Sequence, residues 1–172
     1  MEPQNEYSVF LVDDDKMFLT SLKTSLTRQF GPSLKISEYT TGEECIQNID
    51  TPPDIVILDY YLNDDKDPDT LDGIKVLRKI KSASNDSVVI MLSGEDKLQV
   101  AIDSVKNGAY EYIVKSESAF VRIQHTLKNA IENIKSLREN NKYLKLNISF
   151  AVIILAIVLI DVIWYYSYHY KF

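Results

Sequence analysis

Acidic side chains stand directly after two separate apolar runs of this 172-residue chain. Asp13, Asp14 and Asp15 follow the first run, and Asp59 follows a later one. Two adjacent carboxylates and a third from another strand would form a hard oxygen site suited to Mg²⁺. One of them can also act as a nucleophile and accept a phosphoryl group as an acyl phosphate. These residue types therefore predict phosphoryl transfer beside a magnesium ion, which would offset the developing charge.

A lysine and a serine end two further apolar runs and complete the expected site. The ammonium group of Lys115 can neutralise one phosphoryl oxygen, and the hydroxyl of Ser93 can hydrogen-bond another. Each feature has an ordinary alternative, because aspartates after a strand often cap the next helix and a lone lysine is usually solvated. The arrangement of acids, hydroxyl and lysine after four separate runs favours a site.

Five short runs rich in β-branched and aromatic residues predict buried strands. They cover residues 7–12, 34–39, 55–58, 88–92 and 110–114. Helically spaced apolar residues predict helices between them, and Thr41 and Glu44 have the spacing of a capping box. The alternation predicts an α/β fold, a doubly wound five-stranded parallel sheet with helices on both faces. Ligands bind such sheets beyond the carboxyl ends of the strands, where all the candidate residues fall.

The stretches that carry these residues resemble the receiver domain of two-component response regulators, which has a flavodoxin-like sheet. The matching stretches are residues 10–15, 53–59, 72–73, 89–93 and 108–115, in that order. We therefore expect a receiver domain over residues 1–132. The loop over residues 63–71 is longer than is usual in the family, and its four aspartates look like a calcium-binding loop. Because the loop lacks the central glycine and closing glutamate of an EF-hand, we interpret it as a solvated acidic loop.

The resemblance implies a role for each residue of the site. It implies Asp59 as phosphoacceptor, Asp13, Asp14, Asp59 and the Tyr61 backbone carbonyl as Mg²⁺ ligands, Ser93 and Tyr112 as a switch pair, and Lys115 as the phosphoryl contact. It also implies a sensor histidine kinase or phosphotransfer protein as the donor. Such a domain is not an enzyme in the ordinary sense, since it catalyses only its own phosphoryl transfer and hydrolysis.

Charge is distributed unevenly along the chain. Residues 1–117 carry 22 acidic and 12 basic side chains, whereas residues 118–172 carry 3 and 7, so the net charges are −10 and +4. The acidic part argues against nucleic acid as a partner, because phosphate binding needs a basic face. Cys45 is the only cysteine, which excludes a disulfide framework and predicts a small apolar helix residue.

Residues 148–166 form an apolar segment interrupted in polarity only by Ser149 and Asp161. As a helix it would span about 28 Å, close to the hydrocarbon thickness of a bilayer. Asp161 would cost about 3 kcal/mol at the bilayer centre, but the apolar residues contribute about −5 kcal/mol together. A buried core helix is the alternative, although a receiver already has a core of its own. We therefore expect a transmembrane helix, with residues 133–147 as a helical linker.

Basic residues precede the apolar segment and are rare after it. The positive-inside rule then predicts a single-pass protein of the cell membrane, with a cytoplasmic receiver and a short non-cytoplasmic tail over residues 167–172. Residues spaced alternately three and four apart form a heptad seam, with Asn141 as the polar residue at an a position. The part of the seam expected to pair between chains comprises Ile134, Leu137, Asn141, Leu144 and Ile148. Such an asparagine favours a parallel dimer, so a parallel homodimer is expected.

Together these features predict a membrane-anchored single-domain response regulator whose output goes through contact with a downstream protein. One alternative is a phosphorylation-independent interaction module or membrane adaptor. Another is an aspartate-nucleophile phosphatase, because Asp13 and Asp15 have the two-residue spacing of that class. The two phosphoryl-transfer hypotheses differ in which aspartate becomes labelled.

Overall fold

The computed structural model describes residues 6–62, 72–94 and 97–169, with side chains described as far as Tyr165. The chain divides into two compact units, Met1–Ile131 and Glu132–Phe172. The first unit contains the sheet and all the candidate site residues. The described part of the second unit is helical.

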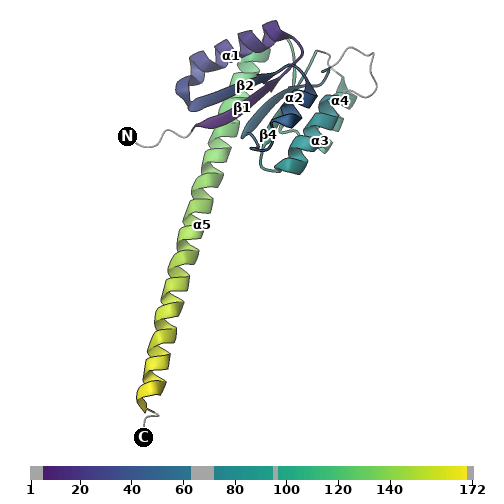
Figure 1. The fold of residues 1–172 in the computed structure, drawn as a ribbon. Coiled ribbons are helices and arrows are strands. Elements are labelled where there is room, and N and C mark those ends of the chain that lie inside the picture. Colours follow the sequence, from purple (N-terminus) through teal and green to yellow (C-terminus); the bar gives the residue numbers. More distant parts are fainter. Residues whose placement is uncertain (1–5, 63–71, 95–96, 170–172) are drawn as a thin grey trace. The chain divides into compact units, whose positions relative to one another are not determined.

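The first unit is built on a five-stranded parallel sheet, as the alternation of apolar runs predicted (Figure 1). The strands lie in the order β2-β1-β3-β4-β5, and each neighbouring pair is parallel. Their bounds are β1 Tyr7–Val12, β2 Leu34–Tyr39, β3 Ile55–Asp59, β4 Val88–Ser93 and β5 Glu111–Val114. β3 and β4 each run one residue further than expected, so Asp59 and Ser93 are the last residues of their strands.

Helices follow each strand. Their bounds are α1 Lys16–Phe30, α2 Gly42–Gln47, α3 Gly73–Ala83, α4 Leu98–Lys106 and α5 Ala119–His169, and a 3₁₀ turn at Gly31–Ser33 follows α1. Asp15 caps α1, since its side chain accepts hydrogen bonds from the backbone N–H groups of Met17 and Phe18. For Asp15, the third of the consecutive aspartates, the alternative role as a helix cap is therefore confirmed.

Two apolar layers cover the sheet, because successive strand residues point to opposite faces. One layer packs strand residues such as Val56 and Met91 against Val76, Leu77 and Ile80 of α3. α1 and the first turns of α5 meet on the other side of the fold, where Gln124 donates a hydrogen bond of 2.8 Å to Ser25. The site thus stands on strands whose side chains are fixed from both faces.

α5 is a helix of 51 residues, and it includes both the expected helical linker over residues 133–147 and the apolar segment that follows. All side chains described between residues 135 and 165 are exposed. Among the described residues this is the one helix long and apolar enough to cross a membrane, and its most apolar stretch is not buried at all.

Candidate phosphoacceptor site

The sheet order brings the predicted residues to one edge of the fold. Val12 pairs with Leu58 in the register of β1 and β3, so the acids that follow these two strands become neighbours. The pairing of β4 with β5 sets Ser93 beside Val114, so the loop that follows β5 begins next to the end of β4. The expected clustering at the carboxyl ends of four strands is therefore what the fold shows.

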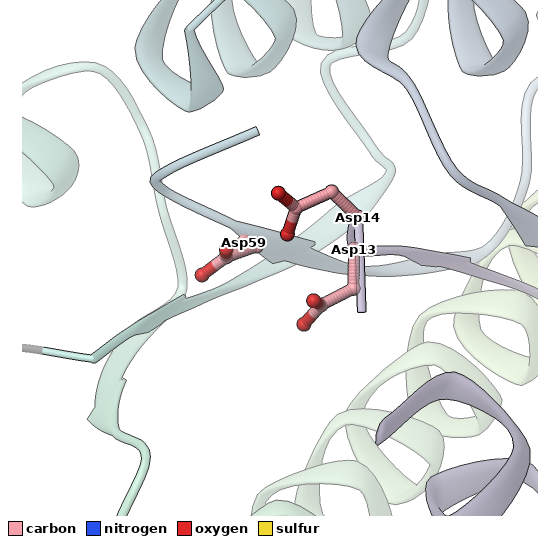
Figure 2. A group of neighbouring side chains, drawn as sticks. All are labelled: Asp13, Asp14 and Asp59. Carbon is pink, nitrogen blue, oxygen red and sulfur yellow. The ribbon is translucent and has the colours of Figure 1, made fainter. Parts of the chain in front are cut away.

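Three carboxylates form the centre of the site (Figure 2). One oxygen from each of Asp13, Asp14 and Asp59 lies within 4.8 Å of the others. Asp13 and Asp59 are buried, with 1% and 3% of their surface exposed, whereas Asp14 is exposed. The cluster therefore opens to solvent on the Asp14 side and is closed at its base.

Lys115 reaches into this cluster from the loop after β5. Its Nζ lies 2.7 Å from Oδ2 of Asp13 and 3.1 Å from Oδ1 of Asp59. Its backbone N–H donates a hydrogen bond of 2.7 Å to the carbonyl oxygen of Ser93, which fixes the base of the side chain to β4. One ammonium group thus bridges two buried carboxylates.

Burial dominates the protonation of these acids. The pKa of Asp59 is raised to about 7, mainly by desolvation and also by the nearby charge of Asp13, against the lowering effect of Lys115. Desolvation likewise raises the pKa of Asp13 against the lowering effect of Lys115. Burial lowers the pKa of Lys115, but the neighbouring carboxylates of Asp13 and Asp59 outweigh burial, so the net shift is upward.

The donor set fits a divalent cation. Within the described part of the chain, Oδ2 of Asp13 and Oδ1 of Asp59 are buried without a hydrogen bond of acceptable geometry, although both face the ammonium group of Lys115. Carboxylate oxygens on two strands match the preference of Mg²⁺ for hard oxygen ligands. The residues of the three-aspartate cluster therefore suit the metal that the sequence predicted.

The remaining predicted residues surround this centre. Ser93 is fully buried at the end of β4. Tyr112 lies on β5 opposite Met91 and packs, half-buried, against the core on the α3 side. Tyr61 is 37% exposed, and Lys97 donates a hydrogen bond of 3.3 Å to its hydroxyl. The acidic loop over residues 63–71 lies outside the described residues, so its interpretation as solvated stays a prediction.

Two residues near the site were not identified from the sequence. The ring of Phe18 lies beside Lys115, with 4.8 Å between its centroid and Nζ. Gly73 packs so closely that a Cβ there would lie 2.5 Å from the carbonyl oxygen of Asp59. Phe18 is one of the helically spaced apolar residues, a pattern that predicted a helix and not a contact with Lys115. The adjacent Asp72 and Gly73 were a signal that could have identified the close approach.

Comparisons with known proteins agree with this geometry. A family model described as the response regulator receiver domain matches residues 9–128. The chain is 30% identical to the transcriptional regulatory protein PrrA of Mycobacterium leprae over 108 residues, which are 62% of this chain and 42% of PrrA. It is 30% identical to a putative response regulator NtrX-like protein of Rickettsia felis over 137 residues, which are 79% of this chain and 27% of that protein. The chain thus spans less than half the length of either relative.

Solved structures show the same likeness. A response regulator receiver domain protein from Clostridium thermocellum shares 28% identity with a TM-score of 0.63, over 76% of this chain and 98% of that one. The signal receiver domain of a LuxO repressor protein from Vibrio parahaemolyticus shares 25% identity with a TM-score of 0.62, over 78% and 98% of the two chains.

Proposed function

Because the chain belongs to the response regulator receiver family, we propose that it accepts a phosphoryl group on Asp59 from a histidine kinase or phosphotransfer protein. The observation that carries the proposal is the bridge from Lys115 to Asp13 and Asp59. It sets a buried nucleophile, a metal-binding acid and a phosphoryl-binding cation within contact of one another. Asp59 is the natural nucleophile because it ends the central strand, between the strands that supply Asp13 and Ser93.

The transfer needs little covalent chemistry from the protein. A carboxylate oxygen of Asp59 attacks the phosphorus atom of a phosphohistidine, the P–N bond breaks, and the imidazole leaves with the electron pair and takes up a proton. Lys115 and Ser93 then bind phosphoryl oxygens, as a cation and a hydroxyl donor. Mg²⁺ held by Asp13, Asp14, Asp59 and the Tyr61 carbonyl would supply further positive charge beside those oxygens. Ser93 and Tyr112 are the proposed switch pair.

Labelling with a small-molecule phosphodonor and Mg²⁺ tests the phosphoacceptor. We expect one acid-stable, base-labile acyl phosphate per chain, reduced to background in Asp59→Asn and strongly reduced by removal of Mg²⁺. Asp15→Asn is the matched control, because asparagine can still cap α1 and the residue takes no part in the proposed transfer.

The same experiment separates the alternatives. A phosphatase with its nucleophile after β1 would keep its label in Asp59→Asn and lose it when Asp13 is replaced. A phosphorylation-independent interaction module would take up no label in any variant. Label that persists in Asp59→Asn contradicts the proposed phosphoacceptor.

The second part of the proposal is that α5 anchors the receiver to the cell membrane, with the receiver in the cytoplasm. The supporting observation is that an exposed apolar stretch of α5 is long enough to cross a bilayer. Exposed apolar surface of this extent is unfavourable in water and marks a site of contact with a membrane or a protein. The basic residues Lys142 and Lys145 precede the apolar stretch, on the side expected to face the cytoplasm. We propose that the output is passed on by contact with another protein.

Fractionation tests the anchor. We expect the full-length protein to sediment with membranes, to resist extraction by high salt or alkaline carbonate, and to dissolve in mild detergent. Removal of residues 146–172 should release a soluble protein that is still phosphorylated on Asp59. Replacing Ile154 and Ile157 by lysine is a point-substitution control, because two charges at the centre of the span raise the insertion cost by about 5–7 kcal/mol. A full-length protein that stays soluble and monomeric without detergent contradicts this part of the proposal.

A further inference from the structure

The ammonium group of Lys115 has a neighbour besides the two carboxylates. Its Nζ lies 4.8 Å from the centre of the Phe18 ring, in the first turn of α1. The Phe18 ring meets the Phe120 ring edge-on, with 5.4 Å between the centroids and 74° between the planes. Phe120 is the second residue of α5. Contacts therefore run without a gap from the phosphoryl-binding cation to the start of the long helix.

This neighbour matters because a lysine side chain is flexible. The base of Lys115 is fixed by its backbone hydrogen bond to Ser93, but its four-carbon stem is not restricted in the same way. The carboxylates hold Nζ only while they carry their charges. Phosphorylation of Asp59 would convert its carboxylate into an acyl phosphate, a mixed anhydride, and place the negative charge on the phosphoryl oxygens, so the oxygen partners of Nζ would change.

A cation–π contact is suited to such a change of partner. It depends mainly on the distance of the cation from the ring face, whereas a hydrogen bond also requires a fixed direction. The Phe18 ring can therefore hold Nζ near the pocket while the ammonium group exchanges a carboxylate oxygen for a phosphoryl oxygen. The edge-on contact with Phe120 limits how far that ring can turn.

We propose that Phe18, backed by Phe120, is a positioning residue that holds the Lys115 ammonium group for the phosphoryl group and couples its position to the first turn of α5. The inference rests on the proposed phosphorylation of Asp59. Movement of Nζ towards a phosphoryl oxygen shifts the ring on which it lies, and the edge contact passes that shift to Phe120. Substitutions at the start of α5 should in turn alter the reactivity of the pocket.

The first test measures phosphorylation of the full-length protein in detergent micelles, with phosphoramidate as donor and Mg²⁺. Phe18→Leu and Phe120→Leu should lower the rate constant at saturating donor by about two- to fivefold, while the half-saturating donor concentration stays unchanged. Phe18→Tyr keeps an aromatic face and should restore the rate. Gln124→Ala is the matched control, because it removes the hydrogen bond to Ser25 between the same two helices without touching Lys115.

A double-mutant cycle separates positioning from a general structural role. If Phe18 acts through Lys115, then Phe18→Leu should have no further effect on the rate in a Lys115→Met background. A ring that only supports the fold would lower the rate by the same factor in both backgrounds. Thermal unfolding of each variant shows whether stability changes alongside the rate.

The second test follows the start of α5. Val121→Cys, at an exposed position, can carry an environment-sensitive fluorophore. The buried native Cys45 should stay unlabelled, because burial raises the pKa of its thiol to about 12. Addition of beryllofluoride with Mg²⁺ should shift the emission of the otherwise wild-type protein, and Phe18→Leu should abolish most of that shift.

The outcomes are distinguishable from failure of the proposed function. If the wild-type protein takes up no label, the phosphoacceptor proposal fails and this inference falls with it. If the wild-type protein is labelled on Asp59 but Phe18→Leu reacts at the wild-type rate, only the positioning role is overturned. An equal loss of rate in the Lys115 and Lys115→Met backgrounds overturns it as well.

Discussion

At the scale of single residues, the site is a buried group of charges that do not cancel. Asp13 and Asp59 carry two negative charges where Lys115 supplies one positive charge, and Asp14 adds another negative charge nearby. Desolvation makes this arrangement unfavourable unless a proton or a cation compensates it. The upward shift of the pKa of Asp59 reflects the first route, and a divalent cation would provide the second.

This imbalance predicts how stability depends on pH in the absence of metal. The pKa of Asp59 is about 7 in the folded protein, against an ordinary value of 3.8. Because the folded state holds this proton more tightly than the unfolded state does, Asp59 should lower the free energy of unfolding as the pH rises from about 4 to about 7. Chemical unfolding of the detergent-solubilised protein in EDTA, followed by near-ultraviolet circular dichroism, measures this slope.

Asp59→Asn is the comparison for that measurement. Asparagine cannot ionise, so the variant should be more stable than the wild-type protein at pH 7, and the advantage should shrink towards pH 4. Saturating Mg²⁺ should reduce the difference at pH 7, because the cation favours the charged carboxylate. A difference between the two proteins that does not change with pH would contradict a raised pKa for Asp59.

At the scale of elements, the position of Asp59, the proposed phosphoacceptor, depends on how closely α3 approaches the end of β3. Gly73, the first residue of α3, donates a backbone hydrogen bond of 3.0 Å to the carbonyl oxygen of Tyr60. A Cβ on Gly73 would lie 2.5 Å from the carbonyl oxygen of Asp59 and 2.7 Å from Cα of Tyr60. Both are backbone atoms, so a larger residue would have to displace the strand end itself.

We therefore expect Gly73→Ala to destabilise the protein by about 1–3 kcal/mol, the range typical of overpacking, and to slow phosphorylation of Asp59. Gly94→Ala is the control, because among the described residues no atom beyond its chain neighbours lies within 4 Å of the position its Cβ would occupy. The two variants add the same methyl group, on α3 and after β4. Equal stability of the two variants would show that α3 can move away without cost.

The elements themselves were largely predictable, because strand and helix periodicities are local properties of the sequence. The partners of individual side chains were harder to predict from the sequence. The expected capping box at Thr41 forms only in part: Thr41 accepts a hydrogen bond from the N–H of Glu44, but the Glu44 carboxylate accepts from the N–H of Thr40. Which backbone N–H the Glu44 carboxylate accepts from depends on the backbone conformation just before α2. The contact of Phe18 with Lys115 joins residues 97 positions apart and depends on packing between α1 and the β5 loop.

At the scale of the whole molecule, α5 combines a receiver helix with a heptad seam and an apolar stretch. Buried residues of its first turns, among them Ile123 and Leu127, belong to the receiver core. Further along, Leu137 and Leu144 are exposed at seam positions. A second copy of the same helix would cover this seam, with Asn141 pairing across a parallel dimer. This arrangement suits two chains that enter one bilayer from the same side.

The dimer predicts a pattern of cross-links. A cysteine at Leu137, on the seam, should form a disulfide between chains in isolated membranes several-fold faster than a cysteine at Glu139, which lies off the seam and is paired with Lys135 at 4.0 Å. Gel mobility under non-reducing conditions measures the product. The native Cys45 is buried and supplies the background value. Equal cross-linking at the two positions would argue against this seam.

The strand that precedes α5 stands at the margin of the sheet, and this position has a mechanical consequence. β5 has four residues and is joined to the sheet through β4, whereas β3 is held by ladders on both sides. A small sliding or tilting of β5 therefore strains the hydrogen bonds to one neighbouring strand instead of two. Lys115 follows this edge strand, so a shift of the strand would move Lys115, and α5 begins four residues later at Ala119. Two ladders thus hold Asp59, the proposed nucleophile, in place, whereas only one ladder opposes a shift of the strand that precedes Lys115.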